Sequence, residues 1–152
     1  MALRNQIEDA LKVAMRDKEA ERVSTLRLIN AAIRDRDIAM RGQSEEGGVT
    51  DEIVLQILGK MVKQRHESAR AYEEGGRLEL AEKERREIAI IEGFLPRRLS
   101  KDEVSAAIDQ AIAEAGASSI RDMGRVMGIL KSEYPGRMDF AAVGPMVKAR
   151  LG

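Results

Sequence analysis

The stretch GFLPRRLSKDEV, from Gly93 to Val104, decides how the chain divides into helical parts. Pro96 has no backbone N–H to donate inside a helix, so we expect the preceding helix to close before it. Ser100 and Glu103 have the spacing of a capping box, in which each side chain accepts a hydrogen bond from the other residue's backbone N–H. A new helix is therefore predicted to open directly after Ser100.

Apolar residues upstream of this stretch recur at the spacing of helix faces. They predict helices over residues 3–15, 23–40, 50–74 and 80–95. The segment from Gly42 to Gly48 is a flexible connector by composition, and the pair Gly75-Gly76 permits a tight reversal. Thr50 is placed to cap the third helix. Four helices with short links favour an antiparallel bundle.

Downstream of the dividing stretch, Gly116 is expected to end the first helix. Ser119 and Asp122 resemble a second, weaker capping box before the next helix. Asp139 is expected to cap a single turn, after which Gly144-Pro145 begins the last helix, because proline suits the first helical position. The predicted fold is all-α, with an N-terminal four-helix bundle-like domain over residues 1–96 and a small C-terminal three-helix domain over residues 97–152.

Composition limits the classes of function. The chain has 26 basic and 26 acidic side chains, so no global field recruits nucleic acid or a membrane. It has no Cys, and no apolar run is long enough for a signal peptide or a membrane span, which predicts a cytoplasmic protein without disulfides. Two Tyr and two Phe are its only aromatics, too few for a base-stacking platform.

No residue pattern predicts autonomous catalysis. His66 is the only histidine and has no convergent ligands at useful spacing, so neither a metal nor a cofactor is predicted. Glu82, Glu84 and Glu87 alternate with basic residues, which is typical of a solvated, ion-paired face. The polar segment 63–74 is likewise expected to face water.

Two glycines in the segment from Asp122 to Asp139 are the main clue to function. Gly124 and Gly128 lie on the same side of a helix, and each costs about 1 kcal/mol of helix stability relative to alanine. Three interpretations remain open: packing against a helix of the same domain, docking of a protein, or close approach of an RNA backbone. Periodicity alone favours packing.

Basic residues around these glycines support the RNA interpretation. From Ser118 onward the chain has 6 basic and 3 acidic side chains. Such cations can contact phosphates without reading sequence. The candidate RNA-binding residues are Arg121, Gly124, Arg125, Gly128, Lys131, Gly136, Arg137 and Lys148.

The tail DMGRVMGILKSEYPGRMDFAAVGPMVKARL, residues 122–151, resembles that of the GatB/YqeY domain family. The segments TLRLINAAIRDRDI (25–38), KMVKQRHESARAYEEGGRLELAEKERREIAIIEGFLP (60–96) and LSKDEV (99–104) resemble its stand-alone YqeY-like members. Nearly the whole chain is covered, and the order of the segments is specific. Gly124, Arg125, Met127, Gly136, Arg137 and Asp139 match the tail motif. Arg125 stands where lysine is frequent, and Met138 where a small residue is usual.

This resemblance implies an all-helical fold in two parts. It also implies kinship with the C-terminal part of the B subunit of the tRNA-dependent amidotransferases, which amidate Glu-tRNA(Gln) or Asp-tRNA(Asn) and whose helical and tail domains hold tRNA. Members of the family carry the label of carbon–nitrogen ligase activity with glutamine as amido-N-donor.

The resulting functional hypothesis is an accessory tRNA-associated module that is not catalytic alone. The partners expected from the resemblance are tRNA and subunits of an amidotransferase or an aminoacyl-tRNA synthetase, with no membrane and no DNA. The alternative is a helical module that docks on a translation factor or an amidotransferase subunit.

Overall fold

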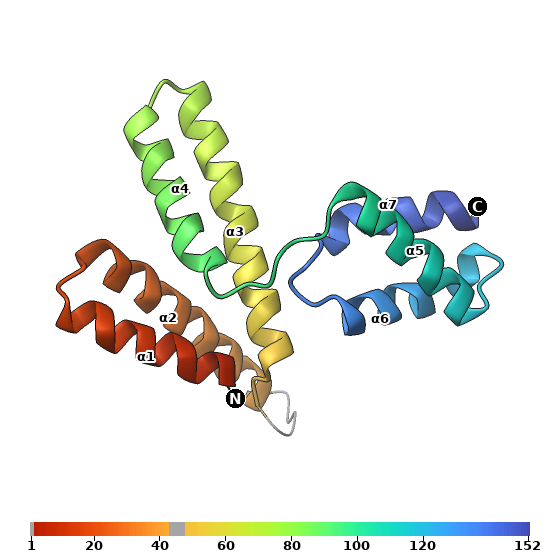
Figure 1. Ribbon diagram of the computed structural model, residues 1–152, viewed down its shortest axis with the longest axis horizontal. Helices are drawn as coiled ribbons and strands as arrows, with labels where there is room; N and C mark the ends of the chain where they lie inside the picture. The colour runs from red at the N-terminus through yellow and green to blue at the C-terminus, as the bar shows by residue number, and fades with distance from the viewer. Residues whose placement is uncertain (1, 43–47) are drawn as a thin grey trace. The chain divides into compact units, whose positions relative to one another are not determined.

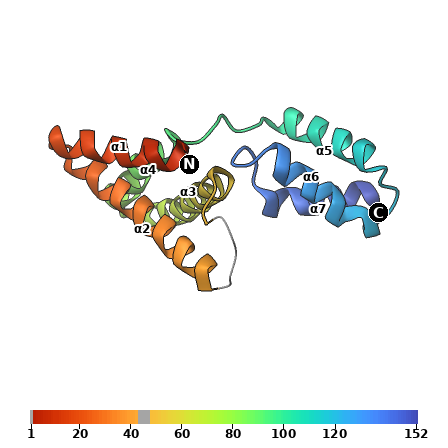
Figure 2. The ribbon, with the colours of Figure 1, turned by 90° about the horizontal axis from the view of Figure 1, so that it is seen from below.

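The computed structural model describes residues 2–42 and 48–152, and every regular element among them is a helix, with no strand, which confirms the all-α prediction. Their contacts form two compact units, Met1–Leu95 and Pro96–Gly152. The first unit contains α1 (Ala2–Arg16), α2 (Ala20–Gly42), α3 (Asp51–Glu74) and α4 (Leu78–Glu92) (Figure 1). The second contains α5 (Lys101–Ala115), the 3-10 turn η1 (Ile120–Asp122), α6 (Met123–Glu133) and α7 (Phe140–Leu151) (Figure 2). Residues 43–47 of the predicted connector lie outside the described residues.

The first unit is built from two helical hairpins, α1 with α2 and α3 with α4 (Figure 1). Its core contains the fully buried side chains of Ile7, Leu26, Ile29, Ile33, Leu58 and Ile91. Thr50 caps α3 as predicted, because its Oγ1 accepts a hydrogen bond from the Ile53 backbone N at 3.3 Å. Asp51 then accepts one from the Leu3 backbone N at 3.2 Å, which joins the beginnings of α1 and α3.

The fourth helix ends earlier than predicted, at Glu92 instead of Leu95. The Gly93 backbone N is shared between the carbonyl oxygens of Ala89 and Ile90 at 3.2 and 3.3 Å, which tightens the last turn. Proline disfavours helical backbone in the residue before it, so the helix cannot continue through Leu95. Leu95 still packs against the core, which explains why its apolar position resembled a helical one.

The sequence predicted that the polar half of α3, residues 63–74, faces water, and this prediction is wrong for part of the segment. Since α4 pairs with α3, one row of α3 side chains is covered, and Ala69 is buried there. Arg65 Nε donates to Glu87 Oε2 at 3.0 Å, and the two side chains are only 15% and 12% exposed. Burial of Glu84, together with the nearby charge of Glu87, raises the pKa of Glu84. The charged pattern therefore includes one nearly buried ion pair.

Replacing Arg65 by methionine should destabilise the first unit by on the order of 3 kcal/mol, because it leaves the Glu87 carboxylate without its cation in a covered site. Urea unfolding with far-ultraviolet circular dichroism measures this change. Arg86→Gln is the matched control, since the Arg86–Glu21 pair at 2.7 Å is exposed on both sides and should contribute no more than about 1 kcal/mol. Equal losses in the two variants would contradict the structural role of the Arg65–Glu87 pair.

The second unit encloses its own core, with Ile108, Val126, Leu130 and Val147 fully buried. Helix α6 packs against both α5 and α7. Ser100 Oγ accepts from the Glu103 backbone N at 3.2 Å, and Glu103 Oε1 accepts from the Ser100 backbone N at 3.0 Å, so the predicted capping box is confirmed.

Two predictions of helix ends in the second unit have different outcomes. Gly116 ends α5 in the left-handed region at φ +61°, as expected. The second capping box is wrong, because the Ser119 side chain makes no capping hydrogen bond. Asp122 instead accepts a hydrogen bond from the Ser118 backbone N at 3.0 Å across η1. The turn is therefore closed by the Asp122 carboxylate, which accepts from a backbone N–H that precedes it, and not by a hydrogen bond to the Ser119 hydroxyl.

The last helix begins at Phe140, not at Gly144-Pro145, so the prediction of its start is wrong. Asp139 caps the whole helix, because its Oδ1 accepts from the Ala141 backbone N at 3.1 Å. Pro145 lies inside the helix and removes one backbone hydrogen bond. The helix tolerates Pro145 because Gly144, the residue before it, has no Cβ that would collide with the proline ring. The buried side chains of Val143 and Val147 anchor the helix in the core on both sides of the missing hydrogen bond.

Candidate nucleic-acid interface

Gly124 and Gly128 lie exposed on α6, on the side opposite the buried Val126 and Leu130. A Cβ atom built on either glycine would meet no atom of the described residues within 4 Å, the helix's own backbone apart. The interpretation that these glycines pack against a helix of their own domain is therefore wrong. The two positions form an open strip of backbone.

Cationic side chains border this strip at helical spacing. Lys131 follows Gly128 by three residues, and Arg125 precedes it by three, so both lie beside it on the helix surface. Arg121, in η1, lies four residues before Arg125, and all three side chains are exposed. We call these five positions the glycine face: Arg121, Gly124, Arg125, Gly128 and Lys131.

The charge of Arg125 is partly balanced within its own helix. Arg125 Nη2 donates to Asp122 Oδ1 at 2.5 Å, in an exposed pair three residues apart. The hydrogen bond from the Ser118 backbone N, followed by that from Arg125, lowers the pKa of Asp122. Asp122 therefore stays ionised, keeps Arg125 close to the helix and competes with any phosphate for it.

An open groove adjoins the glycine face. It is lined by Glu114, Ala115, Arg125, Gly128, Ile129, Ser132 and Glu133. Its carboxylates repel a polyanion. Gly128 lines the groove together with Glu114 and Glu133, so these carboxylates oppose a phosphate chain at Gly128, whereas Gly124 and Lys131 are not among the lining residues.

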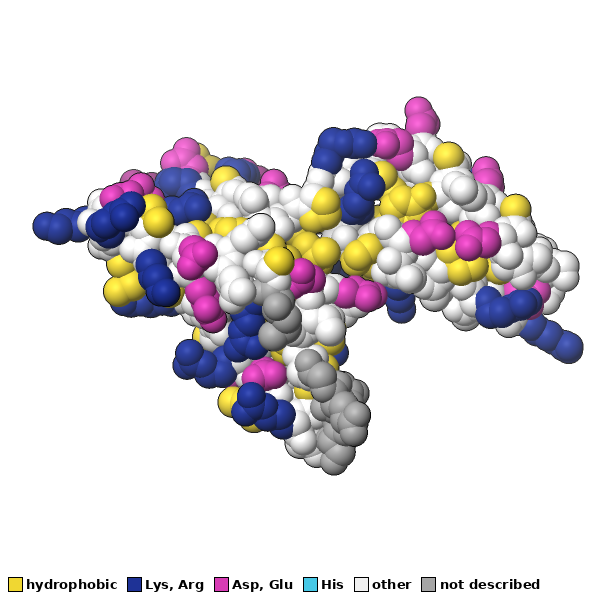
Figure 3. All heavy atoms as spheres, turned by 60° about the horizontal axis from the view of Figure 1, so that its bottom comes forward, with side chains coloured by type: hydrophobic (Ala, Val, Ile, Leu, Met, Phe, Trp, Pro, Cys, Tyr) yellow, Lys and Arg dark blue, Asp and Glu magenta, His cyan; other side chains and the backbone are white. Residues whose placement is uncertain are grey.

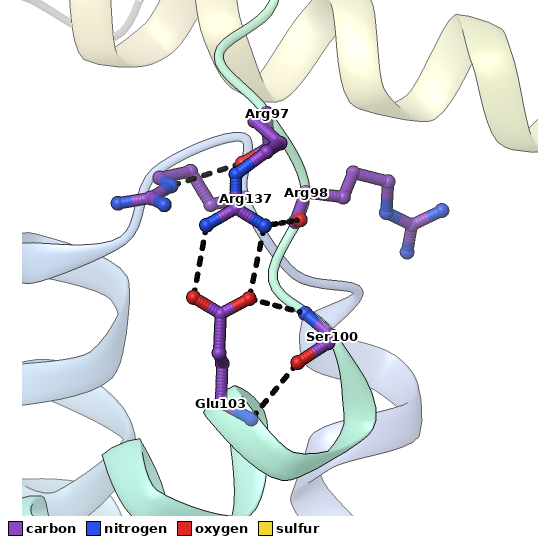
Figure 4. A network of polar contacts seen from close by, with 5 residues as sticks. All are labelled: Arg97, Arg98, Ser100, Glu103 and Arg137. Carbon is purple, nitrogen blue, oxygen red and sulfur yellow. Dashed lines mark hydrogen bonds and ion pairs between the residues drawn. The ribbon is translucent and has the colours of Figure 1, made fainter.

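The other predicted residues lie elsewhere in the unit. Gly136 adopts φ +74°, so it is the conformation of the turn after α6 that requires glycine there. Arg137 is half-buried, and its Nε donates to the Arg97 carbonyl oxygen at 3.0 Å (Figure 4). Its guanidinium lies 6.0 Å from the centre of the Tyr134 ring. Lys148 is exposed on α7. Arg137 therefore joins two parts of the chain, and the structure does not group it with the glycine face.

Arg97 is a structural residue that the sequence analysis missed. Its guanidinium donates two hydrogen bonds to the two oxygens of Glu103, both at 2.9 Å (Figure 4). The Leu99 backbone N donates to the Arg137 carbonyl oxygen at 2.9 Å. The signal was available, since two arginines precede a capping-box glutamate, but only the folded turn shows that the first of them reaches it.

Met138 is buried and packs in the core of the unit. The side chain that departs from the family's small residue is therefore accommodated inside the domain. It does not narrow the outer surface of the turn.

Side chains of both charges are interspersed with apolar ones on the face of the molecule shown in Figure 3. No single sign dominates that face, in agreement with the balanced composition. Among the described residues, no group of three or more His, Asp or Glu side chains is arranged to hold a metal ion. No helix in the described ranges has the length and hydropathy needed to cross a membrane.

The ionised Glu103 should stabilise the second unit in a pH-dependent way. The hydrogen bonds from Arg97, followed by that from the Ser100 backbone, lower the pKa of Glu103 from 4.5 to about 2. A lowered pKa contributes stability above pH 4.5, and this contribution is lost as the pH falls toward 2. Glu103→Gln should therefore be less stable than the wild type at pH 7, with a difference that shrinks below pH 4.5 and vanishes near pH 2.

Amide hydrogen exchange of α5, measured in both proteins at each pH, gives this difference locally. Asp102→Asn removes a carboxylate from the same helical turn and serves as the control, since Asp102 does not belong to the network of Figure 4. A difference between wild type and Glu103→Gln that stays constant from pH 7 to pH 2 would contradict the role assigned to Glu103.

The fold and the glycine face define a class: a small all-helical protein whose C-terminal unit displays an open, cation-bordered stretch of helix backbone. The chain matches the family described as Yqey-like protein over residues 4–151, and it belongs to that family.

Two relatives are similar to most of this chain. The protein of Clavispora lusitaniae named "Altered inheritance of mitochondria protein 41, mitochondrial" is 34% identical over 114 residues, which cover 74% of this chain and 59% of that protein. The protein of the same name from Meyerozyma guilliermondii is 37% identical over 92 residues, covering 60% of this chain and 45% of that protein. The chain thus spans only about half the length of these relatives.

The predicted cytoplasmic location is contradicted by these relatives, since both are named as mitochondrial proteins. The prediction used the lack of cysteine and of long apolar runs, which are features that test for secretion and membrane insertion. Import into an organelle depends on other signals, typically amphipathic and basic, so those two features do not distinguish the cytoplasm from a mitochondrion.

Proposed function

We propose that this protein is an accessory module that binds the phosphate backbone of folded RNA through the glycine face. The observation that supports the proposal is the open pair Gly124 and Gly128 with exposed cations beside it. Missing side chains let a backbone come close to the helix, and the cations neutralise its phosphates.

Recognition in this proposal is by shape. Tyr134 and Phe140 are both half-buried and pack against the core, so neither is free to stack on a base. Contacts to phosphates and riboses carry no sequence information, but they suit the regular backbone of a folded RNA. The resemblance to the tail of the amidotransferase B subunit directs the choice of RNA to tRNA.

The affinity for unmodified tRNA should fall as salt rises, because each neutralised phosphate releases counterions. Arg125→Ala and Lys131→Ala should each reduce the slope of log K against log salt by about 0.7 to 1. Fluorescence titration with labelled tRNA between low and moderate salt measures the slope. Lys101→Ala, an exposed cation on α5, is the matched control and should leave the slope unchanged.

Asp122→Asn should change the affinity for tRNA in the direction opposite to the two alanine variants. The substitution removes the charge that holds Arg125, so it should tighten tRNA binding at low salt. Absence of measurable tRNA binding at low salt, or slopes that change equally in the Lys101 control, would overturn the proposed function.

Substitutions of Gly128 test the open strip itself. Gly128→Ala should raise the free energy of unfolding by about 1 kcal/mol, because the position is helical and nothing crowds the new methyl group. Gly128→Leu should also fold, yet it should weaken tRNA binding by about tenfold or more, since its side chain keeps the backbone of the RNA away. Urea unfolding and the tRNA titration measure the two effects in the same variants.

Unchanged tRNA affinity in a folded Gly128→Leu variant would contradict the role of the strip. Loss of stability in Gly128→Ala would show instead that another part of the protein needs the space.

A further inference from the structure

The outer side of α2 presents basic and apolar residues at a regular interval. Arg27, Arg34 and Arg41 follow one another every seven residues, which places them in one row along the helix. Leu28, Ala31, Asp35 and Ile38 form the adjoining row, with alternating steps of three and four residues. We call these positions the heptad face of α2: Arg27, Leu28, Ala31, Arg34, Asp35, Ile38 and Arg41.

The heptad face is not used by the core of its own unit. The buried positions of α2, among them Leu26, Ile29 and Ile33, lie on the other side of the helix. Leu28 and Ile38 are 45% and 61% exposed, so the core of the unit leaves both large aliphatic side chains accessible to a partner. In Figure 3, basic, apolar and acidic side chains share the part of the molecule that leads to the grey residues.

The arginine row is largely free of partners. Within the described residues, Arg27 and Arg34 form no ion pair or hydrogen bond, while Arg41 Nη2 lies 3.1 Å from Asp37 Oδ2. Asp35 is the one acidic residue of the face. Two of three regularly spaced cations are therefore available to an incoming acidic partner.

A groove continues the same surface at the first turns of α2. It is lined by Met15, Lys18, Ala20, Val23, Ser24, Arg27 and Leu28. Four of these residues are apolar, two are basic and none is acidic. Met15 is 50% exposed, so the apolar strip reaches beyond Leu28 to the end of α1.

We propose that the heptad face, with this groove, docks one acidic amphipathic helix of a partner protein. Side chains that repeat every seven residues return to the same side of the helix after two turns. They can therefore insert repeatedly between the side chains of one partner helix packed alongside. Apolar residues of the partner would cover Leu28 and Ile38, and its flanking Glu or Asp residues would face Arg27 and Arg34. This site is independent of the glycine face.

Other occupants fit the face less well. A second copy of α2 in antiparallel orientation brings the two arginine rows together, and like charges repel. In parallel orientation the arginines of one copy would lie nearest Ala32 and Ala39 of the other, neither of which is charged, and Thr25 is fully buried in its own unit. An RNA backbone would neutralise the arginines but leave Leu28 and Ile38 in water, so it does not account for the apolar row.

A synthetic peptide tests the proposal with the complete chain. The probe is a peptide of three heptads with Leu at positions a and d, which contact the partner helix, and Glu at the flanking positions e and g. Repulsion between its own Glu side chains keeps the peptide from self-associating. We expect saturable binding by fluorescence anisotropy. The affinity should drop by about tenfold or more in Arg27→Glu/Arg34→Glu, and by a similar factor in Leu28→Ser/Ile38→Ser.

Lys60→Glu/Arg70→Glu makes the same change in net charge at two exposed positions of α3 and should bind the peptide as the wild type does. Arg125→Ala should also leave peptide binding unchanged, so failure here and failure of the RNA proposal are distinguishable. Circular dichroism verifies that each variant is folded.

Three results would overturn the proposal. The first is equal binding of a peptide with the same composition in permuted order. The second is full affinity in the Leu28→Ser/Ile38→Ser variant. The third is that Arg27→Glu/Arg34→Glu weakens binding to tRNA or to anionic lipid vesicles while peptide binding persists, since the arginine row would then serve a different class of partner.

Discussion

Burial of Val126 and Leu130 determines which side of α6 faces water, and the candidate RNA site depends on it. The two residues are one helical turn apart, so both can enter the core only when that side of the helix turns inward. Gly124, Gly128 and Lys131 are then carried to the opposite side. The same apolar packing that stabilises the small unit thus also exposes the strip of backbone that distinguishes it.

A polar network organises the beginning of the same unit. Glu103 accepts hydrogen bonds from Arg97 and from the backbone of Ser100, and the side chain of Arg137 reaches back to the Arg97 carbonyl oxygen (Figure 4). The network ties the start of α5 to the turn after α6. Arg137, a residue that matches the family's tail motif, therefore has a structural explanation that does not require a ligand.

The two proposed surfaces differ in what makes them suitable for a partner. The glycine face offers bare helix backbone with cations at its border, which suits a phosphate chain. The heptad face of α2 offers large aliphatic side chains beside regularly spaced arginines, which suits a helix.

The sequence by itself determined the helices, most of their ends and the family. Helical periodicity, Thr50, the Ser100–Glu103 box and Gly116 are local signals, because the atoms that satisfy each cap lie within a few residues of one another. The tertiary structure decided what depends on distant atoms: that Arg65 is covered by α4, that Arg137 is bound to Arg97, and that no neighbour fills the space beside Gly124 and Gly128 among the described residues. The sequence pattern of a glycine pair is the same whether the pair packs against another helix or is exposed. Only the folded structure shows whether a second helix lies beside it.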